Sequence, residues 1–439
     1  MASSRSKGRD RDRHGARDVE AASPIRRRIP WIAIGITLIL LITAAFAADP
    51  IRDAVTGEAV GEASLVASPG YLFLTPLSTS LDAITLLGVA QHIALILWGI
   101  GVFAGIRVWL SRRRETSMKR ESIAGVLFLL GLFLVYAAAT LMPRPMAQLT
   151  LSDPAVLVVD FHSHTKYSHD GRAGWTEDDM RQWYHGAGID VGYITDHATF
   201  EGAERAVSSN PGQAGESTLL LQGIEAFYKG EHVNVLSAGR RYRGLLDATL
   251  KDVDPEALAL STLIPATAPT LIETLPGNLG KVRSITRSDT SAGVVAIEVI
   301  DGSPRGLTQS RRDRHHIVAL ADSLNLALVT GSDNHGYGYA AAGWTLMRVP
   351  GWRGMPTDSI SRRIEDVLRI GRRVSTKTIE RRVAPSDPLS LLLAGPVIAW
   401  EMFATLSGDE RVAWIIWVWA IVIIARGVKR MRLQPSNAA

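Results

Sequence analysis

The chain of 439 residues contains no cysteine. It can therefore form no disulfide bond and offer no thiolate, so any bound metal must rest on histidine, aspartate and glutamate. This absence is compatible with an oxidising compartment without establishing one. No internal repeat is apparent. The net charge of +5 and the pI near 9.5 raise the question of a nucleic-acid partner, and the positions of the charges decide it.

Basic residues gather at the edges of long apolar runs. Residues 1–30 hold nine lysines and arginines, four acids and few apolar side chains, which predicts a disordered basic tail. Further basic clusters occupy residues 107–120 and 426–432. Clusters in such places are typical of topology signals and of contacts with anionic lipids. We therefore expect a lipid bilayer as a partner and no nucleic acid.

Four apolar runs predict membrane-spanning helices, for which about 20 residues are needed. They are Trp31–Ala48, Leu81–Ile106, Ile123–Met142 and Val412–Ala425. A further run, Leu389–Leu406, contains Pro396 and Glu401, and we expect it to lie in or re-enter the membrane interface. Five spans remain the alternative. The first run could instead be a signal peptide cleaved before Ala48, but the long basic leader and the later spans favour an uncleaved anchor.

The positive-inside rule gives the orientation of these spans. A triplet of arginines, residues 26–28, precedes the first span, and the cluster at 107–120 links the second to the third. Both are expected in the cytoplasm, so the third span leads outward and the segment after Pro143 begins outside. The prediction is a multi-pass protein of the cell membrane with a cytoplasmic N-terminus and an extracytoplasmic middle domain. Few polar groups lie in the spans, which argues against a transporter.

The sequence therefore divides into a tail at 1–30, a membrane region with three helices at 31–142, a folded domain at 155–375, a membrane region with one or two helices at 388–427, and a basic tail at 428–439. In the folded domain, β-rich runs alternate with helix-like stretches such as Thr176–Ala187 and Arg311–Leu324. The predicted strands are Val156–Phe161, Val191–Thr195, Leu219–Ile224, Val233–Leu236, Val294–Val299 and Ala327–Thr330. This alternation indicates an α/β fold with a largely parallel sheet or a closed barrel of β/α units.

Residue types that bind metals stand at the ends of these predicted strands. His162 and His164 follow the first strand with one residue between them, so both side chains can project to the same side. The others are Asp170, Asp196, His197, Glu225, His232, Asp333 and His335. Parallel β/α folds collect functional groups at the carboxyl ends of strands, and several such clusters in one domain are hard to explain as packing. Imidazole and carboxylate ligands suit Mn, Fe or Zn, among which the sequence does not choose.

These segments resemble the PHP (polymerase and histidinol phosphatase) family of metallohydrolases. The matching stretches, in the family's order from about Val156 to Gly336, are F-H-S-H-T-K-Y-S-H-D-G, I-T-D-H, G-I-E-A-F, E-H-V-N-V-L and G-S-D-N-H. The resemblance implies a distorted (β/α)7 barrel, here with transmembrane helices on both sides in the sequence. It also implies a cluster of two or three divalent metal ions.

The resemblance also implies a role for each residue. The ligands implied for one metal are His162, His164, Glu225 and Asp333, and Glu225 bridges to a second metal. Those implied for another metal are Asp170, His197 and His335, and His232 is implied on the metal that Glu225 bridges. Asp196 is expected to orient His197 or a metal-bound water. His169 could substitute for Asp170, but the six-residue offset from His164 favours Asp170.

One position departs from the family pattern. Many members carry a further metal-binding histidine in a turn like H-P-G, and the corresponding stretch here, Thr274-Leu275-Pro276-Gly277, has leucine in its place. Leucine cannot bind a metal. Either the second metal is weak or absent, or another histidine such as His315 or His316 serves. Two metal sites are therefore better supported than three.

The expected activity is hydrolysis of a small-molecule ester, a phosphoester first, by metal-activated water. Asp333 or His197 would shuttle the proton to the leaving group. Candidate cations for a phosphate substrate are Lys166, Arg172 and Arg305, each of which could equally be plain surface charge. One alternative is a carboxyl or carbamate ester, because two of the stretches also look like a family branch with that activity. The other is a non-catalytic membrane sensor or scaffold with a degraded metal site.

Overall fold

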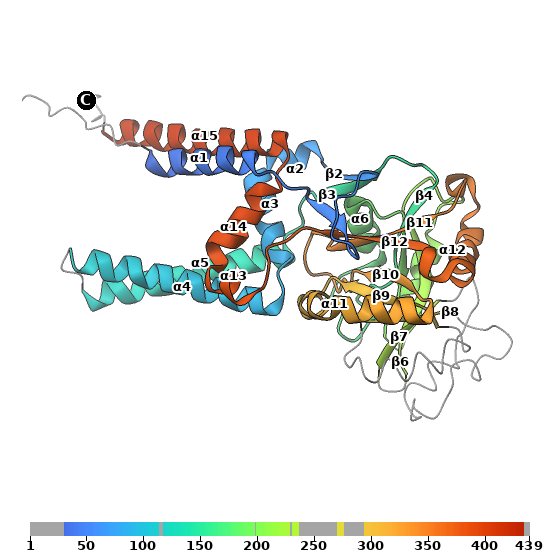
Figure 1. Cartoon of the computed structure of the whole chain (residues 1–439). Coiled ribbons are helices and arrows are strands. Elements are labelled where there is room, and N and C mark those ends of the chain that lie inside the picture. Colours follow the sequence, from blue (N-terminus) through green and yellow to red (C-terminus); the bar gives the residue numbers. More distant parts are fainter. Residues whose placement is uncertain are drawn as a thin grey trace, which may run out of the picture.

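A computed structural model describes residues 30–113, 117–197, 199–228, 231–236, 270–275 and 294–433. The predicted basic tail before residue 30 lies outside this range, as do the last six residues. Within it, a bundle of apolar helices projects from one side of an α/β domain (Figure 1).

The α/β domain is built on a ten-stranded sheet with the order β1-β12-β11-β4-β5-β6-β7-β8-β9-β10. Its strands are β1 Ile51–Asp53, β4 Val156–Asp160, β5 Val191–Ile194, β6 Leu219–Tyr228, β7 Glu231–Leu236, β8 Thr270–Glu273, β9 Val294–Asp301, β10 Ala327–Gly331, β11 Gly343–Arg348 and β12 Thr376–Arg381. A separate two-stranded sheet joins β2 Ala63–Ala67 to β3 Ala147–Leu151. All six strands predicted in the folded domain are confirmed, and β8, β11 and β12 are additional.

The sheet is mixed and curled. Strands β4, β5 and β6 are parallel, as are β8, β9 and β10, but β7 runs antiparallel to both of its neighbours. At the far end of the sheet, β10 curls back toward β4. Phe161 N donates to Thr330 O at 3.4 Å, and a parallel bridge joins Ser163 to Asn334. The largely parallel sheet that we predicted is thus interrupted by the β6–β7 hairpin. The barrel character agrees with the prediction, and the count of seven β/α units stays a prediction.

Helices cover the sheet: α6 Glu177–Ala187, α7 Glu201–Ser208, α11 Pro304–Leu324 and α12 Thr357–Gly371, with short 3-10 turns at Trp352–Gly354 and Arg372–Val374. Helix α6 starts with a capping box, in which Thr176 Oγ1 accepts from Asp179 N at 3.2 Å and the Asp179 carboxylate accepts from Thr176 N at 2.9 Å. It ends at Gly188, whose φ of 75° suits a glycine. The start of α6 was thus readable from the sequence, whereas α11 starts seven residues before the predicted Arg311.

In the described part of the chain, three helices are long and apolar enough to cross a membrane: α4 Val89–Ser111, α5 Met118–Leu141 and α15 Gly408–Leu433, the last with its apolar part at Gly408–Val428. Helix α1, Trp31–Ala45, is apolar but has 15 residues. At 1.5 Å per residue it spans about 22 Å, less than the ~30 Å of a hydrocarbon core. The first predicted span therefore stays a prediction.

The apolar helices lie in two pairs (Figure 1). In one pair α1 lies beside α15, where Trp419 Nε1 donates to Thr37 Oγ1 at 3.2 Å. In the other pair α4 lies beside α5, where the rings of Phe103 and Phe128 stack at 4.4 Å. The N-terminal end of α1, the turn between α4 and α5, and the C-terminal end of α15 all point away from the α/β domain (Figure 1). These are the ends that carry the basic clusters in the sequence.

Two predicted membrane segments are divided in the structure. The run predicted as one span from Leu81 breaks before Val89, so that α3 Thr75–Thr85 is separate from α4. The run Leu389–Leu406 forms two short helices, α13 Pro388–Leu392 and α14 Ala394–Ala404, neither of which is long enough to span a bilayer. The segment between the first two predicted spans contains β1, β2 and α2 Pro69–Phe73 besides the start of α3. Strand β1 pairs with β12, so the N-terminal part of the chain belongs in part to the main sheet.

Candidate metal centre

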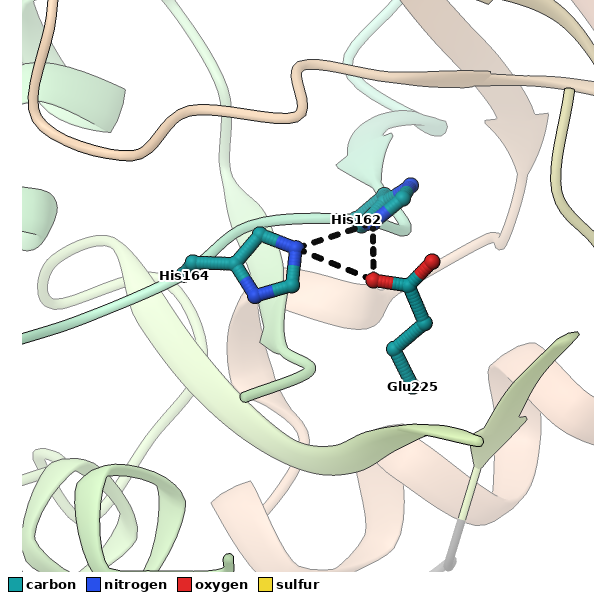
Figure 2. Close-up of side chains that lie close together, drawn as sticks. All are labelled: His162, His164 and Glu225. Atoms are coloured by element: carbon teal, nitrogen blue, oxygen red, sulfur yellow. Dashed lines mark hydrogen bonds and ion pairs between the residues drawn. The ribbon is translucent and has the colours of Figure 1, made fainter. Parts of the chain in front are cut away.

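His162 and His164 stand at the carboxyl end of β4, a strand whose side chains are almost all buried. One residue separates them, so both rings turn to the same side and their Nε2 atoms lie 3.0 Å apart. Their exposed fractions are 3% and 0%. Figure 2 shows the Glu225 carboxylate facing both rings. Two imidazole nitrogens and a carboxylate oxygen thus converge on one point inside the domain.

Glu225 is the central acid of this arrangement. Its Oε2 lies 3.0 Å from His162 Nε2, 3.2 Å from His164 Nε2 and 3.2 Å from His197 Nε2. Its Oε1 lies 2.6 Å from His232 Nδ1. We predicted Glu225 after a strand and His232 before one, but both lie inside strands, on the two arms of the β6–β7 hairpin. The antiparallel hairpin is what brings His232 back over the site.

A second set of ligands lies beside the first. His335 Nε2 is 3.1 Å from Asp170 Oδ2, and His197 Nε2 is 3.6 Å from the same oxygen. Asp333 Oδ1 is 3.4 Å from His164 Nε2. The backbone at Asp333 is left-handed, with φ 46°, and its carbonyl accepts from His335 Nδ1 at 2.9 Å. This turn after β10 aims both side chains into the cluster, and an aspartate tolerates the conformation better than most residues.

All eight residues predicted as metal ligands are therefore brought together. Four overlapping groups have ligand atoms within 4.8 Å of one another. They are His162–His164–Glu225, His164–Asp170–His197, His164–Asp333–His335 and His197–Glu225–His232. Their nitrogen and carboxylate donors suit a divalent ion of the Mn, Fe or Zn type. The residues thus fit a divalent metal, because nitrogens and carboxylate oxygens that face one another this closely can share one cation in place of their protons.

Electrostatics in the site follow from burial and from the paired charges. Burial favours a neutral Glu225, but His162 and the other rings outweigh it and hold the pKa of Glu225 well below its usual range. Burial also opposes charge on His164, yet hydrogen bonds to Asp333 and Glu225 raise the pKa of His164 to about 9. At His197, burial prevails and lowers the pKa to about 4. The cluster therefore presents ionised acids beside a mixture of charged and neutral rings.

Asp196 supports the first ligand loop. Its two oxygens accept from Thr165 N and Thr165 Oγ1, both at 2.6 Å, and the residue is fully buried. We predicted that Asp196 orients His197 or a water. In the structure both carboxylate oxygens of Asp196 are instead hydrogen-bonded to Thr165, the residue that follows His164.

Glu298 and Asp160 are buried acids beside the cluster that the sequence reasoning missed. Glu298, in β9, is fully buried, and its Oε1 lies 3.0 Å from His162 Nδ1. Asp160 ends β4, and its carboxylate accepts from Tyr184 Oη at 2.7 Å and from Ser332 Oγ at 2.6 Å. Burial raises the pKa of Asp160 to about 6. Acids inside otherwise apolar strands were the available signal, because a buried carboxylate requires partners.

The three candidate substrate cations do not form one group. Lys166 lies over the ring of Tyr167, at 5.1 Å. Arg172 lies over the ring of Trp175, at 4.9 Å, and its backbone N donates to His335 O. Arg305 is exposed in the first turn of α11. Lys166 and Arg172 therefore belong to the loop between His164 and α6.

The position of the missing family histidine lies at the edge of the site. Leu275 packs against the core of the domain, and its backbone N donates to Glu298 Oε2 at 3.0 Å. Pro276 and Gly277 lie outside the described residues. His315 and His316 are exposed on α11, and neither is in any ligand group among the described residues. His169 lies next to the site, with its ring 5.0 Å from that of His197.

No family model and no curated protein matches the sequence. Among solved structures, the chain is similar to PsfC from Pseudomonas syringae PB-5123, at 19% identity over 57% of this chain and 99% of that one, with a TM-score of 0.33. It is also similar to a two-domain protein from Bacteroides vulgatus containing a predicted PHP-like metal-dependent phosphoesterase, at 15% identity over 54% and 69%, with a TM-score of 0.33. A third is the lesion-specific endonuclease PfuEndoQ from Pyrococcus furiosus, at 12% identity over 48% and 56%, with a TM-score of 0.33. At these values the geometry of the site has to carry the functional argument.

Proposed function

We propose that this chain is a membrane-anchored, metal-dependent hydrolase of the PHP type, acting on a phosphoester. The observation that carries the proposal is the convergence of three histidines on one oxygen of Glu225, with His232 on its other oxygen. A carboxylate placed in this way is suited to bridge two metal ions.

The ligand sets follow the distances. One ion would be held by His162, His164, Glu225 and Asp333, and a second by Asp170, His197 and His335 with Glu225 as the bridge. His232 would complete the coordination at Glu225 on the open side, where its side chain is 44% exposed. When bound, such ions supply a water of lowered pKa and neutralise charge on the phosphoryl group. Two ions are proposed because no residue in the described part takes the place of the histidine that Leu275 replaces.

The protein's own groups then hold and move protons. Asp333 is held ionised: burial opposes its charge, but His164 and the neighbouring rings outweigh burial and lower its pKa. His197 has a pKa lowered to about 4 by burial, so it is neutral at pH 7. The Asp333 oxygen that binds no ion can accept the proton that the attacking water loses and return it to the leaving oxygen. The neutral ring of His197 is instead suited to bind an ion through Nε2, because it then has no second lone pair to take that proton.

The test is hydrolysis by the full chain in detergent, stripped of metal and reloaded with Mn²⁺, Fe²⁺ or Zn²⁺. Aryl phosphomonoesters and phosphodiesters are compared with aryl acetates and aryl carbamates. We expect metal-dependent release from a phosphoester, abolished in His162→Ala and Asp333→Ala. His315→Ala is the matched control, because His315 is an exposed histidine of the same domain.

Two other outcomes would replace this proposal. Turnover of the acetate or carbamate without any phosphoester turnover would reassign the site to carboxyl or carbamate esters. No turnover of any ester by fully loaded protein would support a non-catalytic sensor or scaffold, which is the reading that Leu275 favours.

We further propose that the chain is multi-pass, with the N-terminus cytoplasmic and the α/β domain outside. Supporting this, the basic ends of α1, the α4–α5 turn and α15 point to the same side, away from that domain (Figure 1). A reporter fused near Arg382 is expected to behave as extracytoplasmic. Cytoplasmic behaviour of the same fusion would reverse the proposed orientation.

A further inference from the structure

The α/β domain sits directly on the ends of the apolar helices. Val89 is the first residue of α4, and its backbone N donates to Thr308 Oγ1 of α11 at 2.9 Å. One turn further along α11, Arg311 donates to Gln91 Oε1 at 3.0 Å and to Leu86 O at 3.1 Å. Direct hydrogen bonds thus hold the first turns of α11 against the start of α4, a candidate span.

A second attachment joins the other helix of the pair. Gly338 N donates to Thr140 O at 2.8 Å, in the last turn of α5. Gly338 has φ 88°, and a Cβ added there would lie 2.4 Å from Thr85 Cγ2. The backbone therefore approaches the helix ends as closely as a glycine allows. Both helices of the α4–α5 pair end against the domain.

Both attachments lie at the edge of the sheet that carries the metal ligands. Helix α11 follows the carboxyl end of β9, and Gly338 follows that of β10. Helix α11 begins beside the apolar helices and runs away from them (Figure 1). Gly338 is three residues after the proposed ligand His335, so their Cα atoms are at most about 11 Å apart. The polar layer on each side of a bilayer is about 5–8 Å thick. If α4 and α5 span the membrane, a centre this close to their ends would lie at or just above the headgroups.

The side chains that neighbour the proposed ligands in the sequence suit such a place. Tyr337, between His335 and Gly338, is 53% exposed. Tyr167 lies in the loop that leads to Asp170. Two cations lie over its ring: Lys166 of the same loop at 5.1 Å and Arg205 of α7 at 5.3 Å. Aromatic and basic residues are typical of protein surfaces at the membrane interface.

We propose that the metal centre takes its substrate from the bilayer, and that this substrate is a lipid whose headgroup carries a phosphoester. The inference rests on the proposed hydrolase function and narrows its substrate class. In the reaction the oxygen of water bonds to phosphorus and the ester P–O bond breaks. The proton lost by water passes to the leaving oxygen, so the products are a phosphate and an alcohol, one of which stays in the membrane.

The geometry can be tested without activity, because the chain has no cysteine and one introduced thiol is the only labelling site. The variant Tyr337→Cys is labelled with a fluorophore and the full chain is reconstituted in vesicles that contain a lipid with a nitroxide on its headgroup. The matched control is Ile370→Cys, an 83% exposed position on α12, which lies on the side away from the apolar helices (Figure 1). We expect strong quenching at position 337 and little at 370. Equal quenching at the two positions would overturn the inference.

Substrate presentation is tested with the metal-loaded full chain in mixed vesicles of phosphatidylglycerol, phosphatidylethanolamine and phosphatidylinositol. The comparison is with dibutanoyl forms of the same lipids, which are water-soluble, at equal bulk concentration. Confinement to the same surface raises effective concentration, so we expect turnover of a long-chain lipid at least about tenfold faster than of its soluble form. Equal rates, or turnover of soluble phosphoesters with none of any lipid, would overturn the lipid assignment alone. No turnover of any phosphoester would overturn the proposed function itself and this inference with it.

Discussion

His162 and Glu298 form the contact that orients the first histidine of the proposed metal centre. His162 Nδ1 donates to Glu298 Oε1 at 3.0 Å, which leaves Nε2 to face Glu225. Glu298 is fully buried, and its other oxygen accepts from Leu275 N at 3.0 Å. The acid is thus held from both sides, and it fixes both the ring orientation and the tautomer of His162. His164 differs, because its Nδ1 is buried with no hydrogen-bond partner among the described residues.

The first prediction concerns metal affinity in variants of Glu298. Glu298→Ala removes the acceptor and should weaken binding of Mn²⁺ or Zn²⁺ by about 10–100-fold. Glu298→Gln keeps an acceptor oxygen but loses the charge, so its loss should be smaller. The measurement is isothermal titration of metal-free protein. Glu365→Gln is the control, because Glu365 is also buried but its Oε2 accepts from Thr270 Oγ1. Unchanged affinity in a folded Glu298→Ala variant would contradict this role.

The second prediction concerns protons released by metal binding. Burial opposes a charged His164, but hydrogen bonds to Asp333 and Glu225 outweigh it and raise its pKa to about 9 in the metal-free protein. At pH 8 the ring therefore carries a proton, which a metal must displace, whereas an ordinary histidine would already be neutral. Affinity should accordingly rise with pH up to about 9. Titrations at pH 8 in buffers of different ionisation enthalpy should show at least one proton released per protein. A result of zero would show that the ring is already neutral there.

The residues that meet in the cluster could be predicted from sequence because they belong to local patterns. His162 and His164 share a face by strand geometry alone, and D-x-H after β10 needs only a turn. Most of these patterns stand at the end of a strand that its own apolar residues predict, whereas Glu225 and His232 lie inside the β6–β7 hairpin. Convergence of the patterns then follows from the α/β fold, which gathers strand ends at one edge. The strands and the convergence of these side chains could therefore be predicted from the sequence alone, and their role as metal ligands stays a prediction.

The supporting residues could not be predicted in this way. Glu298 touches His162 across 136 positions of sequence, and nothing near either residue encodes that contact. The break between α3 and α4 could not be predicted for the same reason. The hydropathy of this stretch indicates one continuous apolar run. In the fold, however, Gln91 is hydrogen-bonded to Ala384 O at 2.7 Å and to Arg311, both distant in the sequence. Such features depend on which segments meet in the fold. Hydropathy and spacing contain no information about them.

The third prediction concerns the buried ion pair at the base of the apolar helices. Arg144 Nη2 lies 2.9 Å from Asp82 Oδ1, with side-chain exposures of 0% and 5%, and Tyr71 Oη donates to the other oxygen at 3.0 Å. Arg144→Ala leaves Asp82 short of its main partner and should destabilise the full chain by about 3–5 kcal/mol. Arg348→Ala breaks an exposed pair with Asp153 and should cost at most about 1 kcal/mol. Melting of both variants in the same detergent makes the comparison. Equal melting temperatures would mean that the buried pair adds nothing.

The fourth prediction is that replacing Asp190 by asparagine increases stability in a pH-dependent way. Asp190 Oδ2 accepts a hydrogen bond from Val158 N at 2.9 Å. Burial raises the pKa of this carboxyl to about 6, above the ~3.9 expected in the unfolded chain. The folded state thus binds the proton more tightly than the unfolded state does. As the pH rises from about 4 to 6, the ionised carboxylate increasingly lowers the free energy of unfolding, and above pH 6 this cost is complete. Asp190→Asn removes this cost, while its amide oxygen can still accept from Val158 N. Because the side chain is partly exposed, the gain at pH 7.5 should be about 1–3 kcal/mol, the lower end being favoured.

The measurement for Asp190→Asn is thermal unfolding of metal-free variant and parent at several pH values. The difference in melting temperature should be largest at pH 7.5 and close to zero at pH 4, where the parent's carboxyl is protonated in the folded state. Asp322→Asn serves as the control, because Asp322 is exposed and paired with Arg373 across the surface, so its substitution should give no such rise with pH. A gain for Asp190→Asn that is the same at pH 4 and pH 7.5 would mean that hydrogen bonding, and not the buried charge, sets the stability at this position.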